Sequence, residues 1–259
     1  AEMQVAEQGY ELPRNDEGAI RETRGLWVST GEVDDQAGID TMVERAGRAH
    51  LNMLLPDIFY RNTFLGQSDL IPTAERVEEG FDPLGYMVEQ AHAANMEMHP
   101  WFCVNYRNPA FFEWFEREYG EDVRFYDEDG NTEPLVADLH RKTYRDFLVN
   151  LMVGVARDYE VDGIHLDYIR TRGRCYCEKC RAEFEEQFGT PLTEATDEQW
   201  VEWNRQAVGD IVRRTAEGVH DVNSDAIMSA AVFAGLEGGA AQGQDPAGWG
   251  AEGWIDLVI

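Results

Sequence analysis

The feature that most constrains the fold of this chain is a regular alternation of strand-like and helix-like segments. Six short apolar segments have the composition of strands, at residues 25–30, 51–58, 97–104, 161–169, 226–234 and 254–259. Helical spacing of apolar residues marks segments between them, at residues 37–50, 81–96, 141–160 and 197–220. Because parallel strands need long crossover connections, this alternation predicts a parallel sheet covered by helices.

Two α/β folds contain such a sheet. A doubly wound open sheet competes with a (β/α)8 barrel, but no glycine-rich phosphate fingerprint follows the first strand. We therefore expect a TIM-type barrel at residues 24–259, preceded by an N-terminal segment at 1–23. An aromatic insertion at 105–140 and a cysteine-rich loop at 171–190 interrupt it. The barrel is expected to be incomplete and part of a longer polypeptide, because only about six strands are visible and the sequence ends within the sixth.

The charge balance of the chain is strongly acidic. Against 50 Asp and Glu there are 22 Lys and Arg, a net charge of −28, which disfavours nucleic acid and anionic membrane surfaces as partners. No apolar run approaches the roughly 20 residues of a membrane span. Only Lys142 and Lys179 are lysines. Acidic surfaces poor in lysine are typical of proteins that work in molar salt, where screening over about 3 Å removes self-repulsion, so we predict a halophilic protein.

The N-terminal stretch AEMQVAEQGYELPRNDEG contains no visible signal peptide. It lacks a basic start and an apolar segment, but it fits the remainder of a chain from which a signal was removed. We therefore favour an extracellular or cell-envelope location over the cytoplasm. The sequence leaves the oligomeric state open.

The fourth predicted strand carries charge where a buried strand is normally apolar. In DGIHLDYIR, residues 162–170, alternation puts His165 and Asp167 on one face and Ile164 and Leu166 on the other. Helices cover the outside of a barrel, so the polar face points inwards. Buried charges are costly unless they are paired or used, and barrel active sites lie at the C-terminal rim. Asp167 is therefore a candidate catalytic carboxylate; a purely structural polar network is the alternative.

Three stretches of the sequence resemble one known family. RGLWVST, DPLGYMVEQAHAANMEMHPWF and YEVDGIHLDYIR occur in the order and spacing of the glycosyl hydrolase-like 10 family, over about residues 24–259. This family comprises barrel proteins related to polysaccharide-cleaving enzymes, some acting on the glycan strands of peptidoglycan. The resemblance implies a glycosidase-type barrel for a polysaccharide or oligosaccharide. The substrate-binding residues that we expect, including those the resemblance implies, are Arg24, Trp27, Asp57, Tyr60, His99, Trp101, Asn105, His165, Tyr168 and Arg170.

Glycoside hydrolysis generally requires two carboxyl groups that flank the scissile bond. Held near two histidines and an arginine, Asp167 is expected to stay ionised, which suits a nucleophile or a base. We assign Glu97 as the second catalytic residue. Asp57 and Asp256 are the other carboxylates of the visible strands, and a residue beyond Ile259 is an equally good candidate.

Two other classes of function stay open. One is a barrel that binds glycan without cleaving it. The other is a metal-dependent hydrolase with His99, His165 and Asp167 as ligands, which is disfavoured because the sequence has no His-x-His pair.

The four cysteines form a second constellation. Cys175, Cys177 and Cys180 give C-x-C-x-x-C after the fourth predicted strand, and Cys103 ends the third. Neighbouring parallel strands allow four thiolates to converge, which fits a closed, structural zinc site. The stretch CYCEKCRAEFEEQFG is similar to glycoside hydrolase family 42 β-galactosidases, in which one cysteine follows the third strand and C-x-C-x-x-C the fourth. Disulfides are the alternative, although Cys175 and Cys177 are too close to pair easily.

The aromatic insertion begins with a short predicted helix at Asn108 and Pro109. Aromatic faces stack on sugar rings, so its composition favours a carbohydrate site. Most of these side chains are expected to pack the insertion onto the barrel. Trp114 and Tyr126 are the candidates for sugar subsites. The cysteines and this insertion depart from the family pattern, so the substrate of the family is not carried over.

Overall fold

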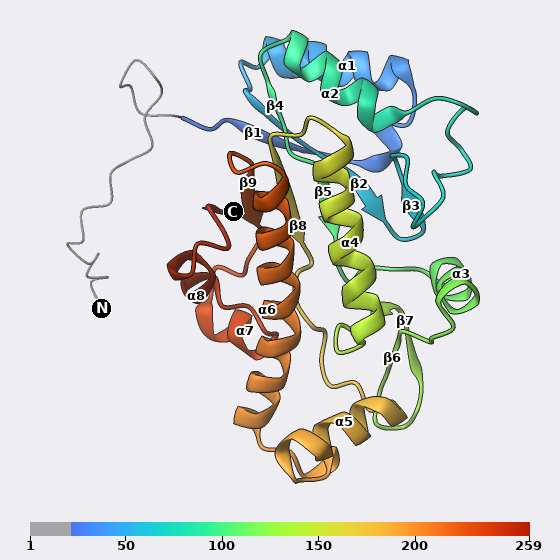
Figure 1. The fold of residues 1–259 in the computed structure, drawn as a ribbon, viewed down its shortest axis with the longest axis vertical. Helices are drawn as coiled ribbons and strands as arrows, with labels where there is room; N and C mark the ends of the chain where they lie inside the picture. Colours follow the sequence, from blue (N-terminus) through green and yellow to red (C-terminus); the bar gives the residue numbers. More distant parts are fainter. Residues whose placement is uncertain (1–21) are drawn as a thin grey trace, which may run out of the picture.

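A curled, mainly parallel sheet is the centre of the computed structural model, which describes residues 22–259 (Figure 1). In their order across the sheet, the main strands are β1 (Gly25–Val28), β2 (Met53–Tyr60), β5 (Trp101–Cys103), β8 (Gly163–Asp167), β9 (Ile227–Ala230) and β10 (Leu257–Val258). All neighbours in this order pair in parallel. The short strands β3 (Thr63–Phe64) and β4 (Glu97–Met98) both pair with β2. The sheet is a half-barrel, which confirms the prediction of an incomplete barrel of the TIM type.

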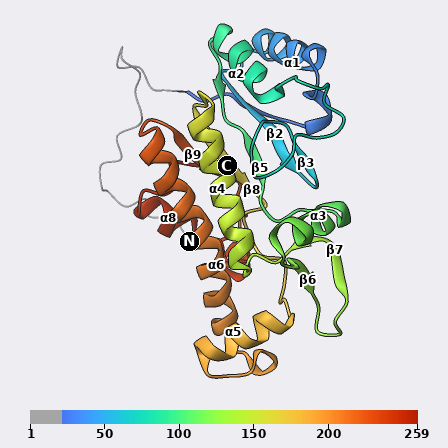
Figure 2. The same ribbon diagram turned by 45° about the vertical axis from the view of Figure 1, so that its right-hand side comes forward.

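Four helices cover the outer face of the half-barrel (Figure 1, Figure 2). They are α1 (Gln36–Arg48), α2 (Pro83–Ala93), α4 (Lys142–Asp158) and α6 (Asp197–Val222). Outward-facing apolar side chains of the strands are buried beneath them, among them Leu54, Phe102, Ile164, Leu166 and Met228. Each such side chain stabilises the fold by roughly 1.5–3 kcal/mol. The burial leaves the inner face of the sheet to polar and aromatic groups.

The remaining elements follow the carboxyl ends of the strands and build the rim (Figure 1). After β1 comes η1 (Thr30–Glu32); after β5 come α3 (Pro109–Tyr119) and the hairpin of β6 (Arg124–Tyr126) and β7 (Thr132–Ala137). After β8 come α5 (Glu178–Phe188) and η2 (Leu192–Glu194), and after β9 come α7 (Leu236–Ala241) and α8 (Pro246–Ala251). These additions lie where a barrel positions its active site.

The two predicted interruptions of the barrel have defined structure. Helix α3 starts at Pro109, and the side chain of Asn108 accepts a hydrogen bond from the Phe111 backbone N–H over 3.0 Å. Its apolar aromatics are buried against α4, as expected for packing residues. The second half of the predicted cysteine-rich loop is helix α5.

Of the predicted N-terminal segment, residues 1–21 lie outside the described part. None of the helices in residues 22–259 has the length and apolar composition that crossing a membrane requires.

Candidate functional site

The inner face of the half-barrel carries a layer of polar and aromatic side chains at one level. The register aligns Asp57 of β2, Trp101 of β5, His165 of β8 and Ser229 of β9. The indole Nε1 of Trp27 on β1 donates to His165 Nε2 over 3.0 Å, and His165 Nδ1 lies 2.8 Å from Ser229 Oγ. Burial lowers the pKa of His165 to about 3, so the imidazole is neutral. His165 is therefore held as an Nδ1–H donor between two strands.

Gly163 is the first residue of β8, and no larger residue fits at this position. A Cβ at position 163 would lie 2.4 Å from His99 Nδ1 and 2.3 Å from the Ile227 carbonyl oxygen. The glycine thus lets the fully buried ring of His99, which lies between β4 and β5, approach β8 closely. His99 Nε2 is 3.2 Å from the Glu97 carboxylate, one level below the layer of His165.

Asp167 ends β8 at the rim, where its carboxylate is held but reachable. It accepts a 2.6 Å hydrogen bond from the Tyr168 backbone N–H and lies 3.7 Å from Arg170 Nη1. Burial raises the pKa of Asp167, while this N–H and Arg170 oppose the rise. Tyr168 has φ of 49°, in the left-handed region. Such a backbone costs on the order of 1–3 kcal/mol and is often retained at functional sites.

Asp57 lies on the inner face, one layer below Asp167, and its environment is different. Burial raises the pKa of Asp57 to about 7, although the positive charge of Arg107 lowers it. Arg107 is itself fully buried, with its guanidinium carbon 3.6 Å from the Phe59 ring centroid. Among the described residues, Asp57 Oδ1 and the neighbouring Trp101 Nε1 have no hydrogen-bond partner. Two buried polar atoms without partners in one layer mark a place for a ligand.

The structure does not bring Glu97 close to Asp167. Glu97 pairs with Met53, the first residue of β2. Asp57 comes four residues later in β2 and pairs with Trp101. Asp167 lies two residues further towards the rim than the level of Trp101. Six residues of strand span about 20 Å. Catalytic carboxyl pairs of glycosidases are separated by about 5–9.5 Å, so Glu97 belongs to the opposite end of the sheet.

Two other predicted residues lie at that opposite end. Arg24 precedes β1; it donates to the His50 carbonyl oxygen and pairs with Glu22 at 2.9 Å. Asp256 precedes β10, and its carboxylate accepts from the Met228 backbone N–H over 2.8 Å. The structure therefore does not bring Arg24 or Asp256 together with the residues of the rim.

Three further predicted contact residues are buried and have structural roles. His99 and His165 lie in the layers described above, both with 0% exposure. Asn105 is also fully buried, and its side-chain amide donates to the Arg170 carbonyl oxygen, which ties the end of β5 to the segment after β8. These side chains position the residues of the rim.

Three tyrosines form a row along the rim, called the aromatic row below. Tyr60 and Tyr106 stack with ring centroids 5.4 Å apart and planes at 8°, and Tyr106 and Tyr168 are also 5.4 Å apart. Arg61 lies 5.1 Å from the Tyr60 ring centroid, and Arg170 lies 4.4 Å from that of Tyr168. The sequence predicted Tyr60, Tyr168 and Arg170, but not Tyr106, which follows β5 within the insertion. All three rings are partly exposed at the rim.

The cysteine cluster differs from the prediction in one ligand. Asp138, Cys175, Cys177 and Cys180 have ligand atoms that all lie within 4.8 Å of one another. Asp138 comes directly after β7, so the cluster joins the hairpin to the start of α5. Cys103 is not a member of this cluster. It ends β5 inside the barrel, where it is level with Asp167 in the strand register. All four cysteines are free thiols, which argues against the disulfide alternative.

The hydrogen bonds within the cluster favour negative charge on Asp138 and Cys177, while the pKa values of the Cys175 and Cys180 thiols are raised. Asp138 Oδ2 lies 3.0 Å from Cys180 Sγ, and Asp138 Oδ1 lies 2.8 Å from His140 Nδ1. Burial alone would raise the pKa of Asp138, but these bonds lower it to about 2. Hydrogen bonds from Cys175 and Cys180 lower the pKa of the Cys177 thiol. A carboxylate and thiolate sulfurs at this spacing can hold a metal ion.

The ligands of the metal-hydrolase alternative do not meet. Both ring nitrogens of His165 are engaged by Trp27 and Ser229, and His99 contacts Glu97 on the far side of the layer from Asp167. In residues 22–259, the only group of metal-binding side chains is the one around Asp138. This geometry disfavours catalysis by a metal at the rim.

Comparisons with known proteins show the family of the chain. The sequence model of a family described as Glycosyl hydrolase-like 10 matches residues 22–259. The chain is 24% identical over 169 residues to the protein named Glycosyl hydrolase YngK of Bacillus subtilis (strain 168), a match that covers 61% of this chain and 31% of that protein. The chain thus spans 31% of the length of the curated relative it matches.

Solved structures of low sequence identity share the fold. The glycoside hydrolase domain of PgaB (BpsB) from Bordetella bronchiseptica superposes with a TM-score of 0.67 at 12% identity, over 92% of this chain and 73% of that one. The β-galactosidase from Bacillus circulans sp. alkalophilus superposes with a TM-score of 0.65 at 15% identity, over 90% of this chain and 39% of that one.

Proposed function

Because the chain belongs to the glycosyl hydrolase-like 10 family, we propose that it hydrolyses glycosidic bonds of a polysaccharide or oligosaccharide, with Asp57 and Asp167 as its carboxyl pair. The observation that carries this proposal is the difference between the two groups. The pKa of Asp57 is raised to about 7 by burial, so it can hold a proton near neutral pH. Burial also raises the pKa of Asp167, but the Tyr168 backbone N–H and Arg170 oppose the rise and favour its anion. Such a split separates the acid from the nucleophile or base.

In this mechanism the sugar ring rests on the aromatic row, within reach of both carboxyl groups. Asp57 donates its proton to the departing glycosidic oxygen. Asp167 either attacks the anomeric carbon or takes a proton from water, and the positive charge of Arg170 favours its ionised form for that step. The partnerless N–H of Trp101 is available to a sugar hydroxyl beside Asp57. The strained Tyr168 backbone fixes the Asp167 carboxylate and one ring of the row together.

The mutation Asp167→Asn tests this proposal. The amide is nearly isosteric but can neither attack nor accept a proton, so release of reducing ends from a panel of polysaccharides should fall by about three orders of magnitude or more. Glycan binding and the melting temperature should change little. An Asp167→Asn variant that hydrolyses glycans at the wild-type rate would remove Asp167 from the mechanism. Wild-type protein that binds glycans but releases no reducing ends would favour the non-catalytic glycan-binding barrel.

We also propose that Asp138, Cys175, Cys177 and Cys180 bind a structural zinc ion. Three thiolates and one carboxylate are donors that zinc accepts. In a tetrahedron with Zn–S bonds of 2.3 Å, the sulfurs are about 3.8 Å apart, which the 4.8 Å limit of the cluster accommodates. The ion would fasten the β6–β7 hairpin to α5 and take no part in the chemistry at Asp167.

A further inference from the structure

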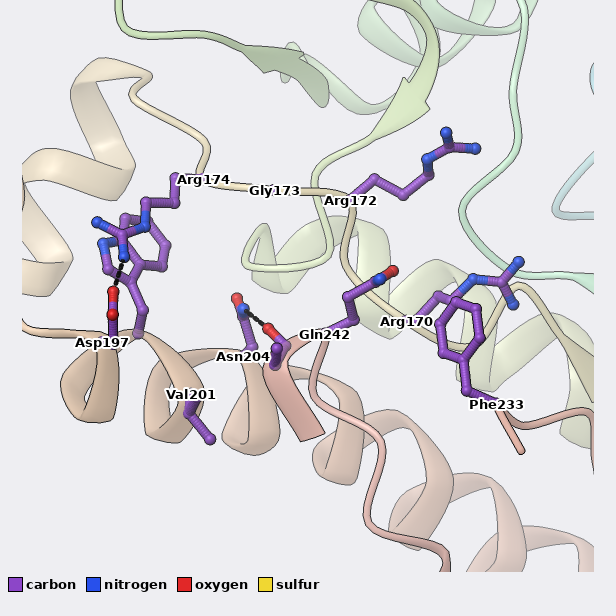
Figure 3. A pocket seen from close by; sticks show the side chains of 11 residues that line it. Arg170, Arg172, Gly173, Arg174, Asp197, Val201, Asn204, Phe233 and Gln242 are labelled. Carbon is purple, nitrogen blue, oxygen red and sulfur yellow. Dashed lines mark hydrogen bonds and ion pairs between the residues drawn. The ribbon is translucent and has the colours of Figure 1, made fainter. Parts of the chain in front are cut away.

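A pocket of about 740 Å³ lies beside the rim, between the segment that follows β8 and the start of α6 (Figure 3). Three arginines of the sequence RTRGR line it, namely Arg170, Arg172 and Arg174. In Figure 3, Arg174 and Asp197 lie at one end of the pocket and Arg170 and Phe233 at the other. A concentration of arginine is unexpected in a chain with 50 acidic and 22 basic residues.

The charges of the lining do not cancel. Asp197 is its only carboxylate, so three arginines against one aspartate leave a net charge of +2. Arg174 pairs with Asp197, and Arg170 is 3.7 Å from Asp167, which lies outside the pocket lining. Arg172 is exposed and has no ion pair or hydrogen bond within residues 22–259. At least one guanidinium of the pocket therefore lacks a local counter-charge among the described residues.

Two of the guanidinium groups lie against aromatic faces. The guanidinium carbon of Arg170 is 4.9 Å from the Phe233 ring centroid, and that of Arg174 is 5.3 Å from the Trp200 ring centroid. A guanidinium on an aromatic face keeps its N–H edge available for a planar carboxylate or an oxyanion such as sulfate. The segment that carries them is fixed by the Thr171 backbone N–H, which donates to the Gln242 carbonyl oxygen over 2.9 Å.

Arg170 joins this pocket to the proposed catalytic site. It stacks on Tyr168 of the aromatic row and pairs with Asp167, while also lining the pocket. A glycan chain on the row would therefore extend into the pocket at the next sugar. The geometry points to a subsite for an anionic sugar residue, so we propose that the substrate is an acidic glycan carrying carboxylate or sulfate groups. This inference rests on the proposed function of the rim.

The net charge of the protein makes such a subsite necessary for a polyanionic substrate. At low salt a net charge of −28 repels an acidic glycan over the whole surface. In molar salt the screening length falls to about 3 Å, so the long-range repulsion is lost while direct guanidinium–oxyanion contacts persist. Recognition of an acidic glycan then depends on the few arginines that touch it.

Binding of three oligosaccharides of equal length tests the inference. The probes are an oligogalacturonate (carboxylate only), a sulfated galactan oligosaccharide (sulfate only) and a neutral β-1,4-galactan oligosaccharide. Titration calorimetry is carried out on the Asp167→Asn protein, to prevent turnover, in about 1 M KCl, where the long-range repulsion between protein and probe is screened. At least one anionic probe should bind about tenfold or more tightly than the neutral one, the usual size of a charged hydrogen bond. The probe that binds more tightly than the neutral one identifies the anionic group, carboxylate or sulfate.

Arg172→Gln and Arg174→Gln should each remove most of this preference and leave neutral binding unchanged. Arg48→Gln on α1, whose side chain is 79% exposed and outside the pocket lining, is the matched control and should have no effect. If Arg174→Gln impairs folding, Arg172→Gln decides, because Arg172 has no partner among the described residues. Equal binding of neutral and anionic probes, or a preference unchanged in the Arg172→Gln variant, would overturn the subsite. So would equal competition by a single-stranded DNA oligonucleotide, since the pocket would then recognise charge alone.

Hydrolysis assays on the wild-type protein separate this inference from the proposed function. Cleavage of neutral and anionic glycans at similar rates, with no dependence on Arg172, would overturn the subsite and leave the glycosidase proposal standing. An Arg172-dependent preference for anionic probes without cleavage of any glycan would overturn the glycosidase proposal and support the subsite.

Discussion

Asp57 and Asp138 are buried to similar extents, with 4% and 2% of their surfaces exposed, yet their carboxyl groups differ in protonation. Burial raises the pKa of Asp57 to about 7, and Oδ1 of Asp57 has no partner among the described residues. Burial acts in the same direction on Asp138, but hydrogen bonds from His140 and Cys180 bring its pKa to about 2. Hydrogen-bond donors therefore decide the charge of a buried aspartate here. One carboxyl group is arranged to exchange a proton and the other to stay an anion.

Replacing the aspartate by asparagine should have opposite effects on stability at the two sites, with a loss at Asp138 and a gain at Asp57. Asp138→Asn removes an anion from a buried network and should lower the free energy of unfolding by about 3–5 kcal/mol. For a domain of this size, that corresponds to a fall in melting temperature of roughly 10 °C. Elemental analysis should find about one zinc ion per wild-type chain, as a four-ligand site requires, and much less in the variant.

Asp225→Asn, at an exposed aspartate in the turn before β9, is the control and should change neither the melting temperature nor the zinc content. If Asp138→Asn kept its zinc and the wild-type melting temperature, Asp138 would not be a ligand, and the contrast with Asp57 would disappear.

Asp57→Asn should instead stabilise the protein, in a pH-dependent way. The folded state holds the Asp57 proton up to about pH 7, while an unfolded aspartate loses it near 3.8. Stability of the wild type therefore falls as pH rises between these values, and the amide, which mimics the protonated group, escapes this loss. Above pH 7 the variant should be more stable by roughly 4 kcal/mol, and near pH 4 the two proteins should agree. Urea unfolding at both pH values measures this, and a variant less stable than the wild type at pH 8 would show that the pKa of Asp57 is not raised in the native state.

Salt should act on the surface and leave the contrast between the two buried aspartates intact. With a net charge of −28 and only two lysines, the exposed carboxylates repel one another, so the melting temperature should rise as KCl increases towards molar concentrations. The stability differences of Asp57→Asn and Asp138→Asn should stay nearly constant over the same range, because buried groups are little screened. A melting temperature that is flat or falls with KCl would contradict the expectation of a halophilic protein.

The fold was predictable because its signal is periodic. Alternation of strand and helix segments gave the parallel sheet and the outer helices, and the family resemblance is confirmed by the match over residues 22–259. The glycine- and alanine-rich helices α7 and α8 were missed, since they lack apolar periodicity.

The site was only partly predictable, because alternation specifies the face of a strand and not the level along it. Glu97 and Asp57 are both carboxylates of predicted strands, but only register shows that one lies at the wrong end of the sheet. Asp138 was missed for a related reason. Asp138 lies within the insertion at residues 105–140, and no spacing in the sequence indicates that the β6–β7 hairpin returns to the cysteines.

The central claim, that Asp57 is the proton donor and Asp167 the anion, is tested most directly by the pH dependence of kcat/KM. For the wild type, the rate should fall above pH about 7, as Asp57 loses its proton. In Asp57→Asn, hydrolysis of a natural glycan should fall by about 10²–10⁴-fold and the alkaline limb should vanish. An aryl glycoside with an activated leaving group needs no proton and should be cleaved at nearly the wild-type rate. An alkaline limb near pH 7 that persists in the variant, with unchanged glycan hydrolysis, would contradict the account.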